Sequence, residues 1–131
     1  MLVWLGADTG LQLTSAALTV RPRNTVVLSG KHAHLVCQTN VSTAASLSWK
    51  FTSVDGEQQA FIYNDNGLNP DYRRRSVSVK TNSSTGVYQL LFDTVQLDDA
   101  GTYTCQDDGG IGEPRAAWMA VLGTIRCDTL D

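Results

Sequence analysis

The sequence lacks the features that define several large classes of protein. No apolar run reaches the roughly 18 residues of a membrane-spanning helix. No segment longer than a few residues keeps an apolar period of 3.6, so helices are not expected to build the fold. Charged residues make up only 18%, and the net charge of −3 argues against a general nucleic-acid binder, which would usually be basic.

A recognisable catalytic set is also missing. No Ser/His/Asp, Cys/His or paired-carboxylate arrangement is discernible, so an enzyme is not expected. His32 and His34 stand two residues apart, a spacing that can hold a metal, but the neighbouring Ala33 and Leu35 take the core face of the same strand. The histidines are therefore expected to be solvated, and neither a metal nor a cofactor is predicted.

The sequence contains instead a series of short β-strand patterns separated by turn signals such as Asp55-Gly56 and Asn66-Gly67. The predicted strands are ALTVRP, NTVVLSG, HAHLVCQT, LSWKFT, QQAFIY, RSVSVK, YQLLFDTV, GTYTCQ and AAWMAVL. Many short strands with turns about ten residues apart predict an all-β sandwich or barrel. A chain of 131 residues is expected to form one domain.

Cysteines and glycosylation patterns give a first indication of the compartment. The three cysteines, Cys37, Cys105 and Cys127, are compatible with one internal bridge and one leftover thiol. Asn40 and Asn82 each begin an Asn-x-Ser pattern in a polar stretch, so both are candidate glycosylation sites. These patterns favour an extracellular protein.

The residues around the cysteines carry a more specific signal. The positions in question are Cys37, Trp49, Leu90, Phe92, Val95, Asp99, Gly101, Tyr103 and Cys105. Trp49 follows the first cysteine by 12 positions, and Asp-x-Gly-x-Tyr-x-Cys ends at the second. This framework resembles the immunoglobulin superfamily over roughly Ala16 to Leu122.

The resemblance implies a two-sheet antiparallel sandwich, with a buried Cys37–Cys105 disulfide tying the sheets together and Trp49 packed against it. It also implies that Tyr103 forms a tyrosine corner and that Asp99 pairs with an arginine at the start of strand D. The candidates are Arg73, Arg74 and Arg75, of which Arg75 is favoured. The rest of this arginine run is interpreted as a solvated loop in preference to a heparin or phosphate site. Cys127 would pair with a second copy or a following domain, or stay free.

The spacing narrows the resemblance to the variable type. About 40 residues between Trp49 and the Leu90 strand leave room for strands C′, C″ and D of a V-type Greek key. The run AAWMAVLG lacks the aromatic-Gly-x-Gly bulge of antigen receptors, and is similar to V-set domains of cell-surface receptors and adhesion molecules. The expected organisation is an N-terminal extension or signal remnant over 1–15, the domain over 16–122, and a tail or start of a linker over 123–131.

The resemblance implies an extracellular recognition module, at the cell surface or secreted, that binds a protein ligand or a second copy of itself, with any membrane tether outside this sequence. The alternative is a soluble immune-type lectin or calcium-dependent ligand binder that uses its end loops. Asp107 and Asp108 could there join Asp65 at a calcium ion, although calcium prefers about six to eight oxygen ligands.

The expected binding surface is the outer face of strands G, F, C and C′. Because Trp49, Tyr103 and Cys105 point inward, their neighbours point outward, and inward Ala117 and Met119 place Trp118 outward beside Thr104. The expected partner-binding residues are Trp118, Ile111, Thr104, Gln106, Lys50 and Thr52. The alternative is a one-residue shift of strand G, which would bury Trp118 in the core.

Overall fold

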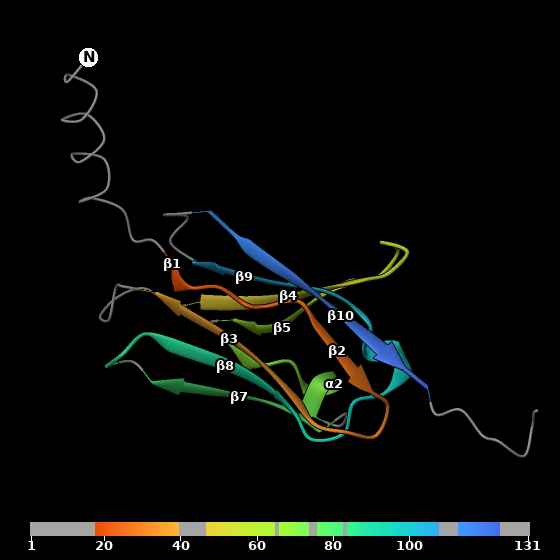
Figure 1. The fold of residues 1–131 in the computed structure, drawn as a ribbon. Helices are drawn as coiled ribbons and strands as arrows, with labels where there is room; N and C mark the ends of the chain where they lie inside the picture. The colour runs from red at the N-terminus through yellow and green to blue at the C-terminus, as the bar shows by residue number, and fades with distance from the viewer. Residues whose placement is uncertain are drawn as a thin grey trace, which may run out of the picture.

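The computed structural model describes residues 18–39, 47–64, 66–73, 76–82, 84–107 and 113–123, and these form two sheets packed face to face (Figure 1). The elements are β1 (Leu18–Val20), β2 (Thr25–Leu28), β3 (Ala33–Thr39), β4 (Leu47–Ser53), β5 (Gln59–Asn64), β6 (Gly67–Leu68), α2 (Pro70–Arg73), β7 (Val77–Asn82), β8 (Val87–Phe92), η1 (Leu97–Asp99), β9 (Gly101–Asp107) and β10 (Arg115–Leu122). The predicted all-β sandwich is confirmed.

One sheet has four strands, in the order β1-β3-β8-β7, and the other has six, in the order β2-β10-β9-β4-β5-β6. This is the V-type arrangement, in which β5 and β6 are strands C′ and C″, and β4, β9 and β10 are C, F and G. One pairing differs from the antiparallel expectation, because β2 runs parallel to β10. The chain leaves the four-stranded sheet after β1 and crosses over residues 21–24, and β2 then joins the edge of the other sheet.

The sequence patterns missed three short elements. β6 has two residues, α2 has four, and η1 has three, so none is long enough to show a period. A capping box stabilises the start of η1. In it the backbone N–H of Gln96 donates to the Asp99 carboxylate at 2.7 Å.

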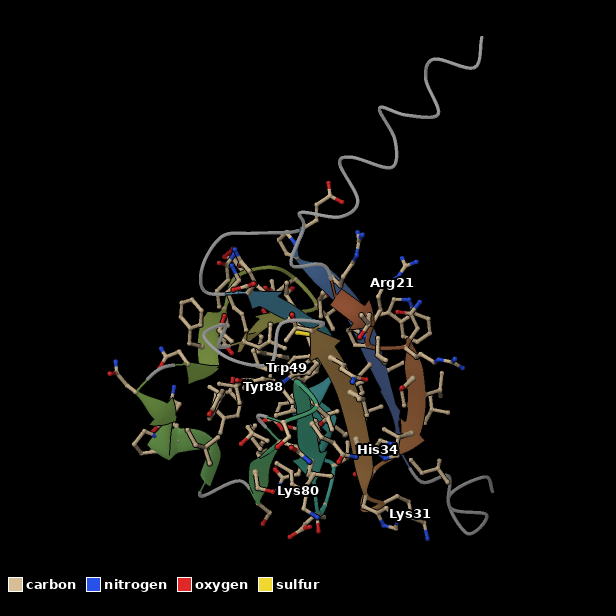
Figure 2. All side chains as sticks on the ribbon, turned by 90° about the vertical axis from the view of Figure 1, so that its left-hand side faces the viewer. Arg21, Lys31, His34, Trp49, Lys80 and Tyr88 are labelled. Carbon is tan, nitrogen blue, oxygen red and sulfur yellow. A yellow bond between two sulfur atoms is a disulfide. The ribbon has the colours of Figure 1, made fainter. Side chains whose placement is uncertain are left out.

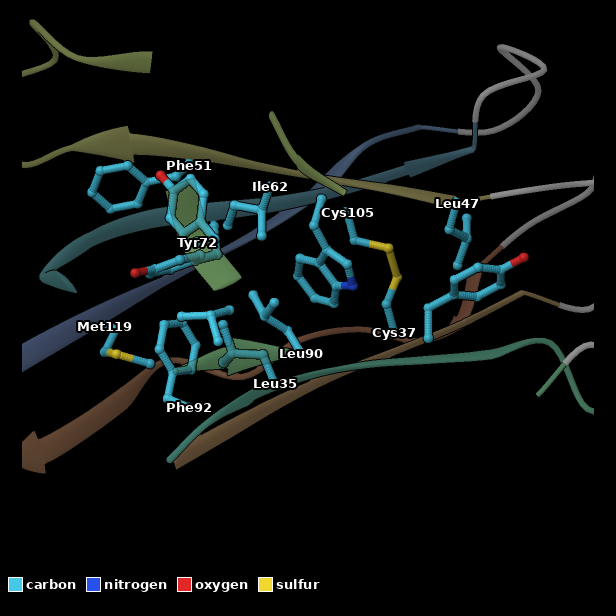
Figure 3. Packing of buried hydrophobic residues seen from close by; sticks show 14 of the residues in the cluster. Leu35, Cys37, Leu47, Phe51, Ile62, Tyr72, Leu90, Phe92, Cys105 and Met119 are labelled. Atoms are coloured by element: carbon cyan, nitrogen blue, oxygen red, sulfur yellow. A yellow bond between two sulfur atoms is a disulfide. The ribbon is translucent and has the colours of Figure 1, made fainter. Parts of the chain in front are cut away.

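The core lies between the sheets around a disulfide that joins Cys37 of β3 to Cys105 of β9 (Figure 3). Trp49 of β4 is fully buried. Other large side chains that are fully buried include Tyr103, Phe92, Leu35, Leu47, Ile62, Leu90 and Met119. The disulfide therefore links the two sheets covalently inside their shared core.

Tyr103 closes the corner between η1 and β9. Its hydroxyl donates to the backbone carbonyl of Asp99 at 2.5 Å, and its ring packs against Phe51 and Phe92, with centroids 5.1 and 5.5 Å away. This satisfies the polar end of a buried aromatic ring. Arg74 and Arg75, and the side chain of Arg73, lie outside the described part of the structure, so the pairing of Asp99 with Arg75 stays a prediction.

Gly101 at the start of β9 has a φ of +155°, and its Cα lies against β4. A Cβ at this position would lie 2.6 Å from Cε1 of Phe51 and would also collide with the backbone oxygen of Thr52. Close approach of two strands therefore requires glycine here.

Candidate functional site

The outer face of the six-stranded sheet presents a half-exposed tryptophan. Trp118 of β10 is 46% exposed, while its neighbours Ala117 and Met119 are each only 2% exposed. The Trp118 amide donates to Oδ1 of Asn24 at 3.0 Å, which ties β10 to the segment that leads into β2. The alternative one-residue shift of this strand is therefore not adopted.

The register across the sheet corrects one expected neighbour. Trp118 is paired with Thr102 of β9, and Thr104 is paired with Ala116. The row that contains Trp118 continues from Thr102 to Thr52 of β4. Alternation along a strand fixes which side chains share a face, but only the inter-strand pairing decides which of them are adjacent.

A second aromatic residue lies on the same face. Phe61 of β5 is paired with Lys50 and is 49% exposed, while the next residue, Ile62, is fully buried. β10 and β5 are three strand spacings apart, or about 14 Å. Phe61 was missed as a site residue, although the alternation in QQAFIY contained the signal once Ile62 was taken as inward.

Exposed aliphatic side chains continue the face beyond Trp118. Val26 and Leu28 of β2 and Leu122 of β10 are all exposed, and Val26 is paired with Ala120 and Leu28 with Leu122. Sequence reasoning missed them because TVVL is apolar at every position after the threonine. Only the parallel pairing of β2 with β10 shows which of its residues point outward.

The polar residues expected at this face lie between the two aromatics. Lys50, Thr52 and Thr104 are partly buried, and Gln106 is exposed. Ser48 is nearly buried, and its hydroxyl donates to the backbone carbonyl of Gln106 at 3.4 Å. Ile111 lies outside the described residues, so its place in the face stays a prediction.

The turn between β4 and β5 carries a structured carboxylate. Oδ1 of Asp55 accepts from the Ser53 hydroxyl at 2.6 Å and from the Glu57 amide at 2.9 Å. These hydrogen bonds lower the pKa of Asp55, the Ser53 hydroxyl contributing most, because they stabilise the charged form.

The alternative metal sites gain no support from the described residues, in which no group of three His, Cys, Asp or Glu side chains is placed to hold an ion. His32 and His34 are exposed. Asp107 is a correction to the loop interpretation, because it is the last residue of β9 and is buried. Asp65 and Asp108 lie outside the described residues, so the calcium alternative stays a hypothesis.

One of the two glycosylation candidates, Asn82, lies within the described part of the structure. Asn82, the last residue of β7, is exposed, and its Oδ1 accepts from the Ser84 amide at 3.0 Å in the turn to β8. Asn40 and Cys127 lie outside the described residues. Within the described ranges no helix is long and apolar enough to cross a membrane.

Comparisons with known proteins agree with this geometry. Residues 20–121 match the family model of the immunoglobulin V-set domain. Myelin protein zero-like protein 2 of Bos taurus is 32% identical over 136 aligned residues, which cover 89% of this chain and 62% of that protein. The chain therefore spans less than two thirds of the length of this curated relative.

Solved structures share the fold at lower identity. The RIG-5 IG1 homodimer matches with a TM-score of 0.66 and 17% identity, covering 80% of this chain and 95% of that one. The first immunoglobulin domain of the mouse polymeric immunoglobulin receptor matches with a TM-score of 0.65 and 16% identity, covering 82% and 96%. At these identities the likeness concerns the fold alone.

Proposed function

Since the chain belongs to the immunoglobulin V-set family, we propose that it is an extracellular recognition module that binds a protein, either a second copy of itself or a separate ligand, through the outer face of its six-stranded sheet. The observation that carries the proposal is the half-exposed Trp118 on β10, next to the edge strand β2 of this face. Tryptophan is enriched among the residues that dominate the energy of protein–protein interfaces.

The surroundings of Trp118 support a binding role. On one side lie the exposed Val26, Leu28 and Leu122, and on the other side a strip of threonines and Lys50 leads to Phe61. A contiguous apolar area with polar neighbours is the composition expected of an interface. Lys50 in the strip favours a contact of moderate affinity over a wholly apolar, permanent pairing.

The compartment follows from the covalent chemistry. A buried disulfide between the sheets persists in oxidising environments, which favours a protein at the cell surface or secreted from the cell. The exposed position of Asn82 is compatible with a glycan there. Pairing between copies is compatible with the fold, because RIG-5 IG1, which shares it, forms a homodimer.

The test uses the purified chain from a secretory eukaryotic host, coated on beads and, separately, assembled into tetramers for staining a panel of cells. Bead clustering detects a second copy as partner, and staining detects a different ligand. Trp118→Ala should weaken one of the two signals by more than about 1 kcal/mol and leave the melting temperature nearly unchanged. Ile111→Asp serves as a second probe of the expected edge of the face.

Leu97→Ala is the matched control. Leu97 is exposed like Trp118, but it lies in η1, between β8 and β9, and is not part of any strand of the outer face. Its substitution should leave both signals intact. If neither bead clustering nor cell staining distinguishes Trp118→Ala from Leu97→Ala, the face is not the binding site.

A further inference from the structure

Charge is segregated in this molecule. Strands β1, β2, β3, β7 and β8, which include the whole four-stranded sheet, contain no Asp or Glu, although the chain as a whole has a net charge of −3. The basic groups on this side are exposed and are Arg21, Arg23, Lys31, His32, His34 and Lys80. Figure 2 shows Arg21, His34 and Lys31 following one another along this side, with Lys80 nearby.

A groove lies in the middle of this basic region. Its volume is about 740 Å³, within the roughly 300–1,000 Å³ typical of ligand sites, and it runs between β2 and β3. Arg21, Arg23, His32 and His34 all line it, together with apolar side chains such as Val26 and Leu35. Among the described residues that line it there is no carboxylate.

The groove exists because the chain changes sheets. In the described structure β1 pairs with Gln38 and Thr39 of β3, and residues 21–24 then carry the chain across to the other sheet. Residues 33–36 of β3 therefore pair on one side, with β8, and face the groove on the other. The crossover itself supplies Arg21 and Arg23.

The basic groups are free for a ligand. Within the described ranges, Arg21, Arg23, Lys31 and Lys80 form no ion pair; Arg115 pairs with Glu113 at 3.4 Å. The described carboxylate closest in register is Asp93, which follows β8 and stands opposite position 32, since Ala33 is paired with Phe92. The arginine end of the groove is thus the more positive one.

We propose that this groove is a second, separate binding site, which takes a linear polyanion, namely a sulfated polysaccharide chain. The end of β1 is paired with Gln38, and seven residues of extended chain separate Gln38 from Lys31. This length is about 23 Å. Basic groups spread along this length match successive charged units of a polymer better than one isolated phosphate. Val26 borders both this groove and the apolar area beside Trp118, but the arginines that supply the charge of the groove are not part of the proposed Trp118 face.

The experiment measures binding of a size-defined heparin oligosaccharide to the purified chain at about 0.15 M salt, by calorimetry. Arg21→Ser/Arg23→Ser should weaken binding about tenfold or more, and binding should fall steeply as salt rises, because a bound polyanion releases its counterions. Asp93→Asn should tighten binding. Lys50→Ser, which removes one positive charge from β4, three strand spacings away from β2 at the edge of the groove, should have no such effect.

Three results would overturn the proposal. One is absence of heparin binding at this salt concentration. Another is an equal loss in Lys50→Ser and in the double arginine variant, which would show attraction without a site. The third is equally tight binding of a polyglutamate peptide of the same charge, which would point to an acidic protein as occupant. Bead clustering should be unchanged in the arginine variant, which separates this site from the Trp118 face.

Discussion

The outer faces of the two sheets differ in the chemistry that they expose. The six-stranded sheet exposes Trp118 and Phe61 and the aliphatic residues beside them, whereas the described part of the four-stranded sheet exposes no aromatic side chain and no carboxylate. Both sheets bury their inner residues in one core, so their inner faces obey the same packing rules. The outer residues are not needed for that core, and their difference is the basis on which two kinds of partner are proposed.

The largest loss of stability is expected from removing the one disulfide that links the two sheets in the described structure. Cys37→Ala/Cys105→Ala should lower the free energy of unfolding by about 4 kcal/mol, because the bridge closes a separation of 68 residues. Chemical denaturation would measure the loss. Binding at both faces should fall together; loss at one face alone would show that the sheets fold independently.

Gly101→Ala should cause the next largest loss of stability, and this loss should arise within the six-stranded sheet. A Cβ there would collide with the backbone of Thr52 and the ring of Phe51, at a cost of about 3 kcal/mol. Gly56→Ala is the matched control, since it has a φ of +77° but no atom within 4 Å of the added Cβ. The control should lose only about 1 kcal/mol in denaturant unfolding. Equal losses would mean that backbone angle and not contact is the cause.

Tyr103→Phe tests the corner that joins β9 to η1. Loss of the hydroxyl leaves the Asp99 carbonyl without this donor and should cost about 1–2 kcal/mol of stability. Tyr63→Phe is the control, because the Tyr63 hydroxyl makes no hydrogen bond to any described residue and its ring packs at a tilt against Tyr88, with centroids 6.2 Å apart. Thermal unfolding of the two variants should separate them clearly.

Phe61→Ala tests the outer face of the six-stranded sheet alone, and its effect on partner binding should be smaller than the stability losses above. The half-exposed ring should contribute about 1 kcal/mol to partner binding and less than about 0.5 kcal/mol to stability. The bead and cell assays measure the first quantity and thermal unfolding the second. Binding of heparin should not change, because Phe61 of β5 lies four strand spacings, or about 19 Å, from β2, the strand of the same sheet that borders the groove.

The smallest effect concerns pH and the turn between β4 and β5. The folded pKa of Asp55 lies below its ordinary value of 3.8, so the stability that its hydrogen bonds provide is present above that value and is lost as the pH falls through the folded pKa. Asp55→Asn should therefore be slightly less stable than the parent chain at about pH 6. The difference in stability should shrink at acid pH, below the ordinary pKa value of 3.8. Unfolding curves at several pH values would show this, and a constant difference would rule out the titration of Asp55 as its source.

The sequence by itself determined the fold type and the inner faces. Period-two alternation predicted an all-β sandwich or barrel and the outward direction of Trp118, and the family resemblance carried by Trp49, Tyr103 and the two core cysteines implied the V-type arrangement. The physical reason is that inward positions are constrained at every second residue by burial. Such constraints are local and can be read along one strand.

Only the tertiary structure decided which outward residues are neighbours. The pairing of Trp118 with Thr102, the exposure of Val26 and Leu28 beside β10, and the groove beside β3 all depend on how separate strands are aligned. No pattern in residues 21–24 predicts a change of sheet, and yet this crossover opens the groove and places Arg21 at its edge. Inter-strand register and sheet switching arise from contacts between distant segments, so no single stretch of sequence encodes them.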